Sequence, residues 1–145
     1  MKLKVYISND HRGVGLKLYL QNMLVAAGYD VENLGTDDPD AGVDFPEITK
    51  LTTDKLADDP DARGIIICGT GGGAVIAANR FRHIRATRCD RPEQARDDRF
   101  HDDANVLAFG ADDMDLEVAF LTAQAFLSSP FEAIERRIRR IKQIS

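Results

Sequence analysis

The sequence predicts an α/β fold, with a parallel sheet that has helices packed on both of its faces. Two observations support this prediction. Strand-like apolar segments alternate with helix-like segments from one end of the chain to the other, which is the order that builds parallel sheets. Residues 64–68 form a continuous apolar run, as expected for a strand buried on both faces. We expect one domain over residues 1–145, because two domains in this length would each have too small a core.

The first half of the chain is expected to hold two strands, over residues 3–8 and 30–34, and two helices, over residues 13–27 and 46–57. In the first helix, apolar residues recur from Leu16 at the spacing of one helical face. Gly28 follows this helix, where glycine commonly ends one. Pro46 stands in the first turn of the second helix, where proline is tolerated.

The second half is expected to hold three strands, over residues 64–68, 84–89 and 105–109, and four helices, over residues 73–80, 91–100, 114–127 and 131–144. The last helix is predicted from an apolar stripe of Phe131, Ile134, Ile138 and Ile141. Ligands of such sheets bind beyond the carboxyl ends of the strands. The first candidates for a site therefore follow the first, third and fourth strands: Asn9, Asp10, His11, Cys68 to Gly73, and Asp90.

Composition and charge exclude several classes of protein. The net charge of −5 argues against general binding of nucleic acid. No apolar run approaches the length of a membrane span. Only two cysteines occur, and the N-terminus is unlike an export signal, so we expect free thiols and a cytoplasmic location. Residues 136–145 carry five basic residues and no acid, a cationic segment on an otherwise acidic chain.

The glycine loop, Gly69-Thr70-Gly71-Gly72-Gly73, is the strongest local signal for a site. Its backbone N–H groups, between a buried strand and a helix, can bind a phosphate, a carboxylate or a developing oxyanion. It is not a P-loop, because no Gly-Lys-Ser/Thr follows. It does fit a relaxed dinucleotide pattern, which uses Ala74 and an acidic residue about 20 positions further on, Asp90. A turn without a ligand is the third alternative.

Cys68 ends the buried strand directly before the glycine loop. A helix N-terminus favours a thiolate, so Cys68 can serve as a base or nucleophile. It can equally be a small buried apolar residue. Cys89 precedes no such loop, and we expect it to be structural.

Two of the three histidines are candidates for acid–base chemistry. His11 follows the first strand and His101 follows a charged helix, whereas His83 is expected on the surface. A metal site can be drawn from Asp10, His11, His101 and Asp102, but their spacing matches no ligand motif. We therefore expect no metal.

Arg136 and Arg140 lie four residues apart, on one face of the last predicted helix. Paired guanidinium groups suit bidentate binding of phosphate. The alternative is a solvated helix end whose cations complement the helix dipole.

Nearly the whole chain resembles the ribose-5-phosphate isomerase B / galactose-6-phosphate isomerase (RpiB/LacAB) family. The resemblance is carried by Ser8–Gly13, Leu16–Lys17, Leu34–Thr36, Asp44–Pro46, Gly64–Asn79, Ile84–Ala86, His101–Ala108 and Phe131–Glu132. It implies a Rossmann-like three-layer sandwich with a five-stranded parallel sheet. It also implies a homodimer, or a dimer of dimers, with active sites shared between subunits, so that the helix 131–144 would pack on a partner subunit.

The resemblance further implies an aldose–ketose isomerase of the pentose phosphate pathway, which converts ribose 5-phosphate to ribulose 5-phosphate through a cis-enediol without a metal or other cofactor. Cys68 would be the base and His101 would open the sugar ring. The enediolate would be stabilised by Thr70 and the N–H groups of Gly69, Gly71, Gly72 and Gly73. The remaining substrate contacts would come from Asp10, His11, Asp102, Arg136 and Arg140.

Three acidic residues depart from the family's pattern. Asp90, Asp102 and Asp112 stand where the family usually has a histidine, an asparagine and a phosphate-binding arginine. Like charges near a dianionic phosphate are unfavourable, so the same chemistry on a four-carbon, six-carbon or unphosphorylated sugar is an alternative. A nucleotide-binding module and an inactive partner subunit are alternatives of a different class.

Overall fold

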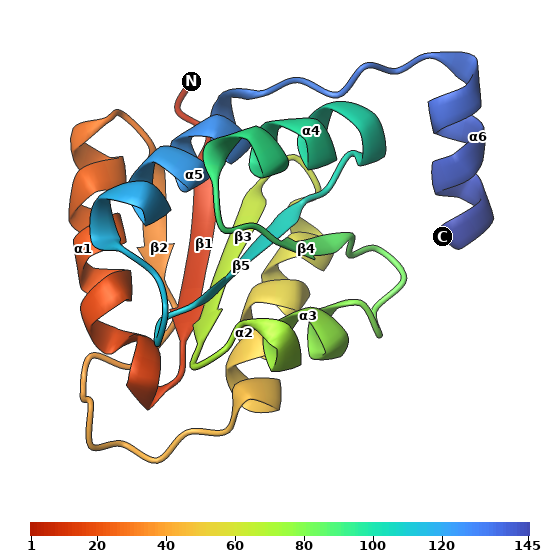
Figure 1. Cartoon of the computed structure of the whole chain (residues 1–145). Helices are drawn as coiled ribbons and strands as arrows, with labels where there is room; N and C mark the ends of the chain where they lie inside the picture. Colours follow the sequence, from red (N-terminus) through yellow and green to blue (C-terminus); the bar gives the residue numbers. More distant parts are fainter.

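The computed structural model describes all residues, 1–145, and its sheet has five strands that are all parallel to their neighbours (Figure 1). The strands are β1 (Lys4–Asn9), β2 (Asp30–Asn33), β3 (Arg63–Cys68), β4 (Ala86–Arg88) and β5 (Val106–Gly110). The helices are α1 (Val14–Ala26), α2 (Phe45–Asp58), α3 (Gly72–Ala78), α4 (Pro92–Asp102), α5 (Leu116–Ser128) and α6 (Glu135–Ile144), with a short 3-10 helix, η1 (His11–Gly13), before α1. The predicted fold class is confirmed.

Helices cover both faces of the sheet and give the fold its three layers (Figure 1). Helices α1, α4 and α5 pack on one face, against strand residues that include Ile65 and Ile67. Helices α2 and α3 pack on the other face, against residues that include Ile66 and Cys68. Successive side chains of a strand point to opposite faces, so the buried part of β3 has apolar residues at every position from Ile65 to Cys68.

The strand order is β2-β1-β3-β5-β4, which places β5 between β3 and β4. The end of the fourth strand therefore lies one strand further from Cys68 than we expected, and Asp90 does not follow a direct neighbour of β3. The end of β5 lies next to β3 instead, with Gly110 paired to Cys68. The physical reason is burial. All of β5 is buried, whereas β4 has three half-buried or exposed residues and forms the edge of the sheet.

The last helix is shorter than predicted, because α6 begins at Glu135 and not at residue 131. The preceding residues, 131–134, are not helical, and the Glu132 N–H donates to the carbonyl of Phe100 at 3.0 Å. Helix α6 stands away from the sheet (Figure 1) and has no buried residue. None of the helices combines the length and the apolar composition needed to cross a membrane.

Candidate active site

Cys68 ends β3 at the carboxyl edge of the sheet, directly below the glycine loop. Its side chain is buried, with 4% of the residue exposed. The Gly71 N–H donates to Cys68 Sγ at 3.1 Å, which fixes the sulfur relative to the loop. The structure therefore brings Cys68 and the loop together as predicted.

The loop adopts a backbone shape that favours glycine at Gly71. This residue has a φ of 83°, and a Cβ here would lie 3.0 Å from the backbone nitrogen of Gly110. Gly72 and Gly73 are the first residues of α3, so their N–H groups have no acceptor within the helix. Thr70 is exposed beside them. The loop thus offers several donors to an oxyanion above Cys68.

Asp10 and His11 form the turn after β1, which is a direct neighbour of β3. The Asp10 N–H donates to the carbonyl of Ile67 at 3.0 Å, which holds this turn beside Cys68. Asp10 Oδ1 accepts two N–H groups of η1, at 3.0 and 3.2 Å, and caps that helix. His11 Nδ1 is buried and has no hydrogen-bond partner. The turn therefore reaches the predicted edge, and Asp10 has a capping role that the sequence did not reveal.

A fully buried lysine supports this turn. Lys17 of α1 donates from Nζ to the carbonyl of Thr36 at 2.8 Å and forms an ion pair with Asp37. Asn9 Nδ2 donates to the same carbonyl and to that of Asp10, at 3.0 and 2.8 Å. The lysine thus ties the loop after β2 to the end of β1. Sequence reasoning missed this role, because a lysine between apolar positions of a helix suggests an exposed side chain.

His101 and Asp102 lie at the opposite edge of the sheet. Both are exposed in the last turn of α4, not beyond its end as predicted for His101. This turn leads into β5, whose first residue, Val106, pairs with Gly64 at the start of β3. Cys68 lies four positions further along β3, at about 3.3 Å per position. One chain therefore does not bring His101 to the cysteine.

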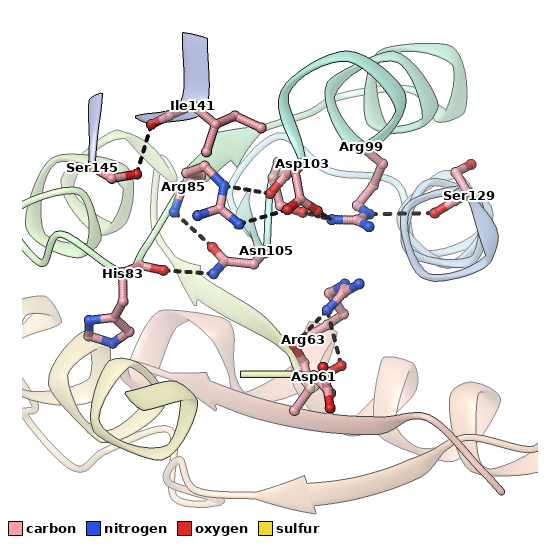
Figure 2. A network of polar contacts seen from close by, with 12 residues as sticks. Asp61, Arg63, His83, Arg85, Arg99, Asp103, Asn105, Ser129, Ile141 and Ser145 are labelled. Atoms are coloured by element: carbon pink, nitrogen blue, oxygen red, sulfur yellow. Dashed lines mark hydrogen bonds and ion pairs between the residues drawn. The ribbon is translucent and has the colours of Figure 1, made fainter. Parts of the chain in front are cut away.

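A network of ion pairs fixes this end of α4 (Figure 2). Asp103 follows the helix with a φ of 50°, which is unusual for a residue other than glycine. Arg99 Nη1 donates to Asp103 Oδ1 at 2.8 Å, and Arg85 Nη2 donates to Asp103 Oδ2 at 3.1 Å. Arg99 is buried, with 3% of the residue exposed. The two arginines hold the strained residue in place, and with it the turn that presents His101.

Arg136 and Arg140 lie exposed in α6, four residues apart as predicted. The helix's other two arginines form ion pairs with glutamates of this chain, whereas this pair forms none. Helix α6 lies beside the end of α4 that carries His101, away from the carboxyl ends of β1 and β3 (Figure 1). The two cations are therefore free for a ligand, and within one chain they are remote from Cys68.

Two alternatives lose support. Within one chain the four candidate metal ligands fall on two opposite edges of the sheet, and no three His, Cys, Asp or Glu side chains of one chain come together. A dinucleotide site places its acidic residue on the strand next to the glycine-loop strand. Asp90 instead follows β4, two strands away from β3, where it forms an ion pair with Arg88 at 3.3 Å.

Cys89 has the structural role that we expected. It is completely buried, and this burial raises the pKa of its thiol to about 12. The thiol therefore stays protonated at neutral pH.

Comparison with known proteins gives consistent matches over the whole chain. Residues 5–144 match the Ribose/Galactose Isomerase family. Ribose-5-phosphate isomerase B of Escherichia coli (strain K12) is 37% identical over 142 residues, which cover 98% of this chain and 94% of that protein. A 4-deoxy-4-sulfo-D-erythrose isomerase of Clostridium sp. (strain MSTE9) is 36% identical over 108 residues, which cover 74% of this chain and 68% of that protein.

Solved structures agree with these matches. A ribose 5-phosphate isomerase from Thermotoga maritima has a TM-score of 0.94 and 38% identity, covering 99% of this chain and 98% of that chain. Ribose-5-phosphate isomerase B from Mycoplasma genitalium with bound ribulose-5-phosphate has a TM-score of 0.93 and 33% identity, covering 99% of this chain and 95% of that chain.

Proposed function

The chain belongs to the ribose/galactose isomerase family, and from this premise we propose that it is an aldose–ketose isomerase that converts ribose 5-phosphate to ribulose 5-phosphate. The observation that carries the proposal is the buried Cys68 thiol beneath the N–H groups of the glycine loop. A proton transfer next to a carbonyl needs a base and a stabilised oxyanion in the same place. Both are available here.

Cys68 acts as the base in its thiolate form. Its sulfur takes the proton from C2 of the open-chain aldose, and the electrons of the C2–H bond form a C1–C2 double bond. The aldehyde oxygen O1 becomes the anionic oxygen of a cis-enediolate. The thiol then returns the proton to C1, and the hydroxyl proton of O2 moves to O1 as O2 becomes the ketone. Atoms and electrons balance without an added redox partner.

The glycine loop stabilises the charge that forms on the sugar oxygen. The N–H groups of Gly72 and Gly73 lack helical acceptors, and the Thr70 hydroxyl is exposed beside them. Donors of this kind, fixed before the reaction, lower the barrier without reorganising. The Gly69 N–H remains a proposed donor, whereas the Gly71 N–H, which we expected to be another, donates to Cys68 Sγ instead. Asp10 and His11, from the neighbouring strand end, hold hydroxyl groups of the sugar.

The remaining site residues come from a second copy of the chain. His101, Asp102, Arg136 and Arg140 lie away from Cys68 in one chain, so a complete site needs a homodimer or a dimer of dimers. His101 opens the sugar ring and the arginine pair contacts the phosphate across the interface. Helix α6 supports this arrangement, because it has no buried residue within its own chain.

Another sugar is the second candidate function, with the same chemistry. Asp112 follows β5 and its N–H donates to the carbonyl of Gly69 at 3.0 Å, so an acid borders the loop where the family usually has a phosphate-binding arginine. The relative from Clostridium is named for a four-carbon sulfonated sugar. Because of this relative, the first alternative substrate that we propose is a four-carbon sugar with an anionic end.

The test is to incubate the purified protein with ribose 5-phosphate and to follow ketose formation. Cys68→Ala removes the base, while Cys89→Ala is a matched control at a buried cysteine outside the site. We expect turnover by the wild type and by Cys89→Ala, and a loss of about 10²–10⁴-fold in Cys68→Ala. Turnover by Cys68→Ala at the wild-type rate would exclude Cys68 as the base. A wild type inactive on ribose 5-phosphate but active on a four-carbon anionic aldose would establish the alternative.

A further inference from the structure

Two arginines touch the glycine loop, and they do so in different ways. The guanidinium group of Arg12 lies over Gly69, where a Cβ would be 2.5 Å from both Cζ and Nη1 of Arg12. Arg88 touches Gly71 through its methylene stem, at Cδ, and its guanidinium lies 3.3 Å from a carboxyl oxygen of Asp90. Of these two arginines, Arg12 therefore places its guanidinium against the loop, whereas Arg88 places its methylene stem there.

The position of Arg12 is set by the fold. It follows Asp10 and His11 in the turn after β1, and its N–H donates to Asp10 Oδ1 at 3.0 Å. Because Gly69 has no side chain, the guanidinium can lie directly against the backbone of the loop. About half of the Arg12 side chain, 52%, is exposed, so a ligand above the loop can reach it.

Asp112 holds the guanidinium from the other side. It follows β5, and its carboxylate forms an ion pair with Arg12 Nη2. The backbone of this segment is fastened to the loop, because the N–H groups of Ala111 and Asp112 donate to the carbonyls of Cys68 and Gly69, at 2.8 and 3.0 Å. The ion pair thus spans the ends of β1 and β5 above β3. It is partly exposed, and exposed ion pairs are weak, so an oxyanion of the substrate can compete with the carboxylate.

We infer that Arg12 is the residue with which this subunit binds the terminal oxyanion of the substrate, and that Asp112 holds the guanidinium over Gly69 until the substrate takes it. The inference rests on the proposed function and specifies its substrate class: a sugar whose end carries a tetrahedral oxyanion, a phosphate or a sulfonate. A guanidinium binds such a group through two parallel N–H donors. In this chain the guanidinium for the oxyanion therefore comes from the turn after β1. In the family's pattern it comes from an arginine after the fifth strand.

The test compares wild type, Arg12→Met and the control Arg88→Met. Arg88 is the matched control, because it borders the same loop but lines a separate hollow of about 250 Å³ with Asp90 and Asp113. KM and kcat are measured with ribose 5-phosphate and with a sulfonated four-carbon aldose, which distinguishes the two oxyanions. We expect Arg12→Met to raise KM about tenfold or more with kcat changed less than about threefold, and Arg88→Met to change KM less than about twofold.

Equal KM values in Arg12→Met and wild type would overturn the inference, as would an equal loss in both variants. Direct binding of inorganic phosphate, measured by calorimetry, separates this inference from the proposed function. A wild type that isomerises neither sugar but binds phosphate, with binding lost only in Arg12→Met, would support Arg12 and contradict the proposed function. A wild type with neither activity nor phosphate binding would overturn both. Circular dichroism confirms that each variant is folded.

Discussion

The N–H of Gly71 points at the sulfur of Cys68, with 3.1 Å between the nitrogen and Sγ. This contact depends on the left-handed backbone of Gly71, whose φ is 83°. The hydrogen bond connects Cys68, the proposed base, with the glycine loop, which would stabilise the oxyanion. It therefore fixes the position of the base relative to the loop.

Gly71→Ala should therefore damage both stability and activity. A Cβ at this position would lie 3.0 Å from the Gly110 nitrogen and 3.1 Å from the Phe109 carbonyl carbon, and both are backbone atoms that cannot turn aside. Because of these contacts and the left-handed φ, we expect Gly71→Ala to lose about 1–3 kcal/mol in the free energy of unfolding. We also expect a lower kcat. Gly72→Ala is the matched control, because its nearest neighbour is Thr70 Oγ1 at 3.8 Å. Equal melting temperatures for the two variants would contradict the prediction.

A mixing experiment tests the shared site. Cys68→Ala and His101→Ala should each be inactive as pure proteins, because every site lacks one of the two groups. After unfolding and refolding together, half of the dimers carry one of each chain, and each of these has one intact site. We expect about a quarter of the wild-type activity in the mixture. No recovery, in a mixture shown by mass spectrometry to contain mixed dimers, would mean that both groups act from the same chain.

A charge exchange tests the role of Arg12 in another way. In Arg12→Val with Asp112→Arg, a guanidinium stands at the other end of the same ion pair, still beside Gly69. If substrate binding requires only a guanidinium above the loop, the double variant should reverse most of the rise in KM caused by Arg12→Val. Its KM should be within about threefold of the wild-type value. Asp112→Arg alone places two guanidinium groups together. An additive loss in the double variant would show that residue 112 does not face the oxyanion.

The fold was predictable because the pattern of apolar residues along the sequence reflects which side chains are buried. The uninterrupted apolar run of β3 and the small residues of α3 indicate a central strand that leads into a tight turn, and both are observed. The order of β4 and β5 was missed, although the polar residues of β4 were an available signal of an edge strand. The start of α6 was missed because Phe131 and Ile134 continue its apolar stripe, although the chain before Glu135 is not helical and is fastened to α4 by the hydrogen bond from Glu132 to Phe100.

The candidate site was predictable only as far as neighbouring residues define it. Cys68, the glycine loop and the Asp10–His11 turn meet because adjacent parallel strands end at one edge. The contact of Arg12 with Asp112 joins residues one hundred positions apart. It depends on the strand order, which we did not predict from the sequence. The buried Lys17 was hidden for a related reason, since its partners come from another strand's loop.

The ion pair of Lys17 and Asp37 makes a prediction about acid stability. Hydrogen bonds from Lys17 and Asn33 hold the pKa of the Asp37 carboxyl below its ordinary value. A carboxyl with a lowered pKa in the folded state contributes stability above its unfolded pKa, and this contribution is lost as the pH falls through the folded pKa. In Lys17→Met the pKa of Asp37 should rise towards its ordinary value, as measured by carbon-13 NMR of the carboxyl. An unchanged titration would show that Asn33 alone determines it.

Arg99 gives a sharper prediction for stability, because it is buried and has several partners. Its Nη1 donates to Asp103 Oδ1 at 2.8 Å and to the carbonyl of Ala104 at 2.6 Å, and its Nε donates to that of Ser129 at 3.5 Å. Arg99→Met would leave these acceptors unpaired and remove a cation that holds the left-handed Asp103. We expect a loss of about 3 kcal/mol in the free energy of unfolding by urea. Arg96→Met is the control, since Arg96 is exposed on the same helix and its substitution should change stability by less than about 0.5 kcal/mol.

The turn that carries His101 should also loosen in Arg99→Met, so kcat on the cyclic sugar should fall in Arg99→Met but not in the control. Equal stability of the two variants would mean that Arg85 alone maintains the end of α4.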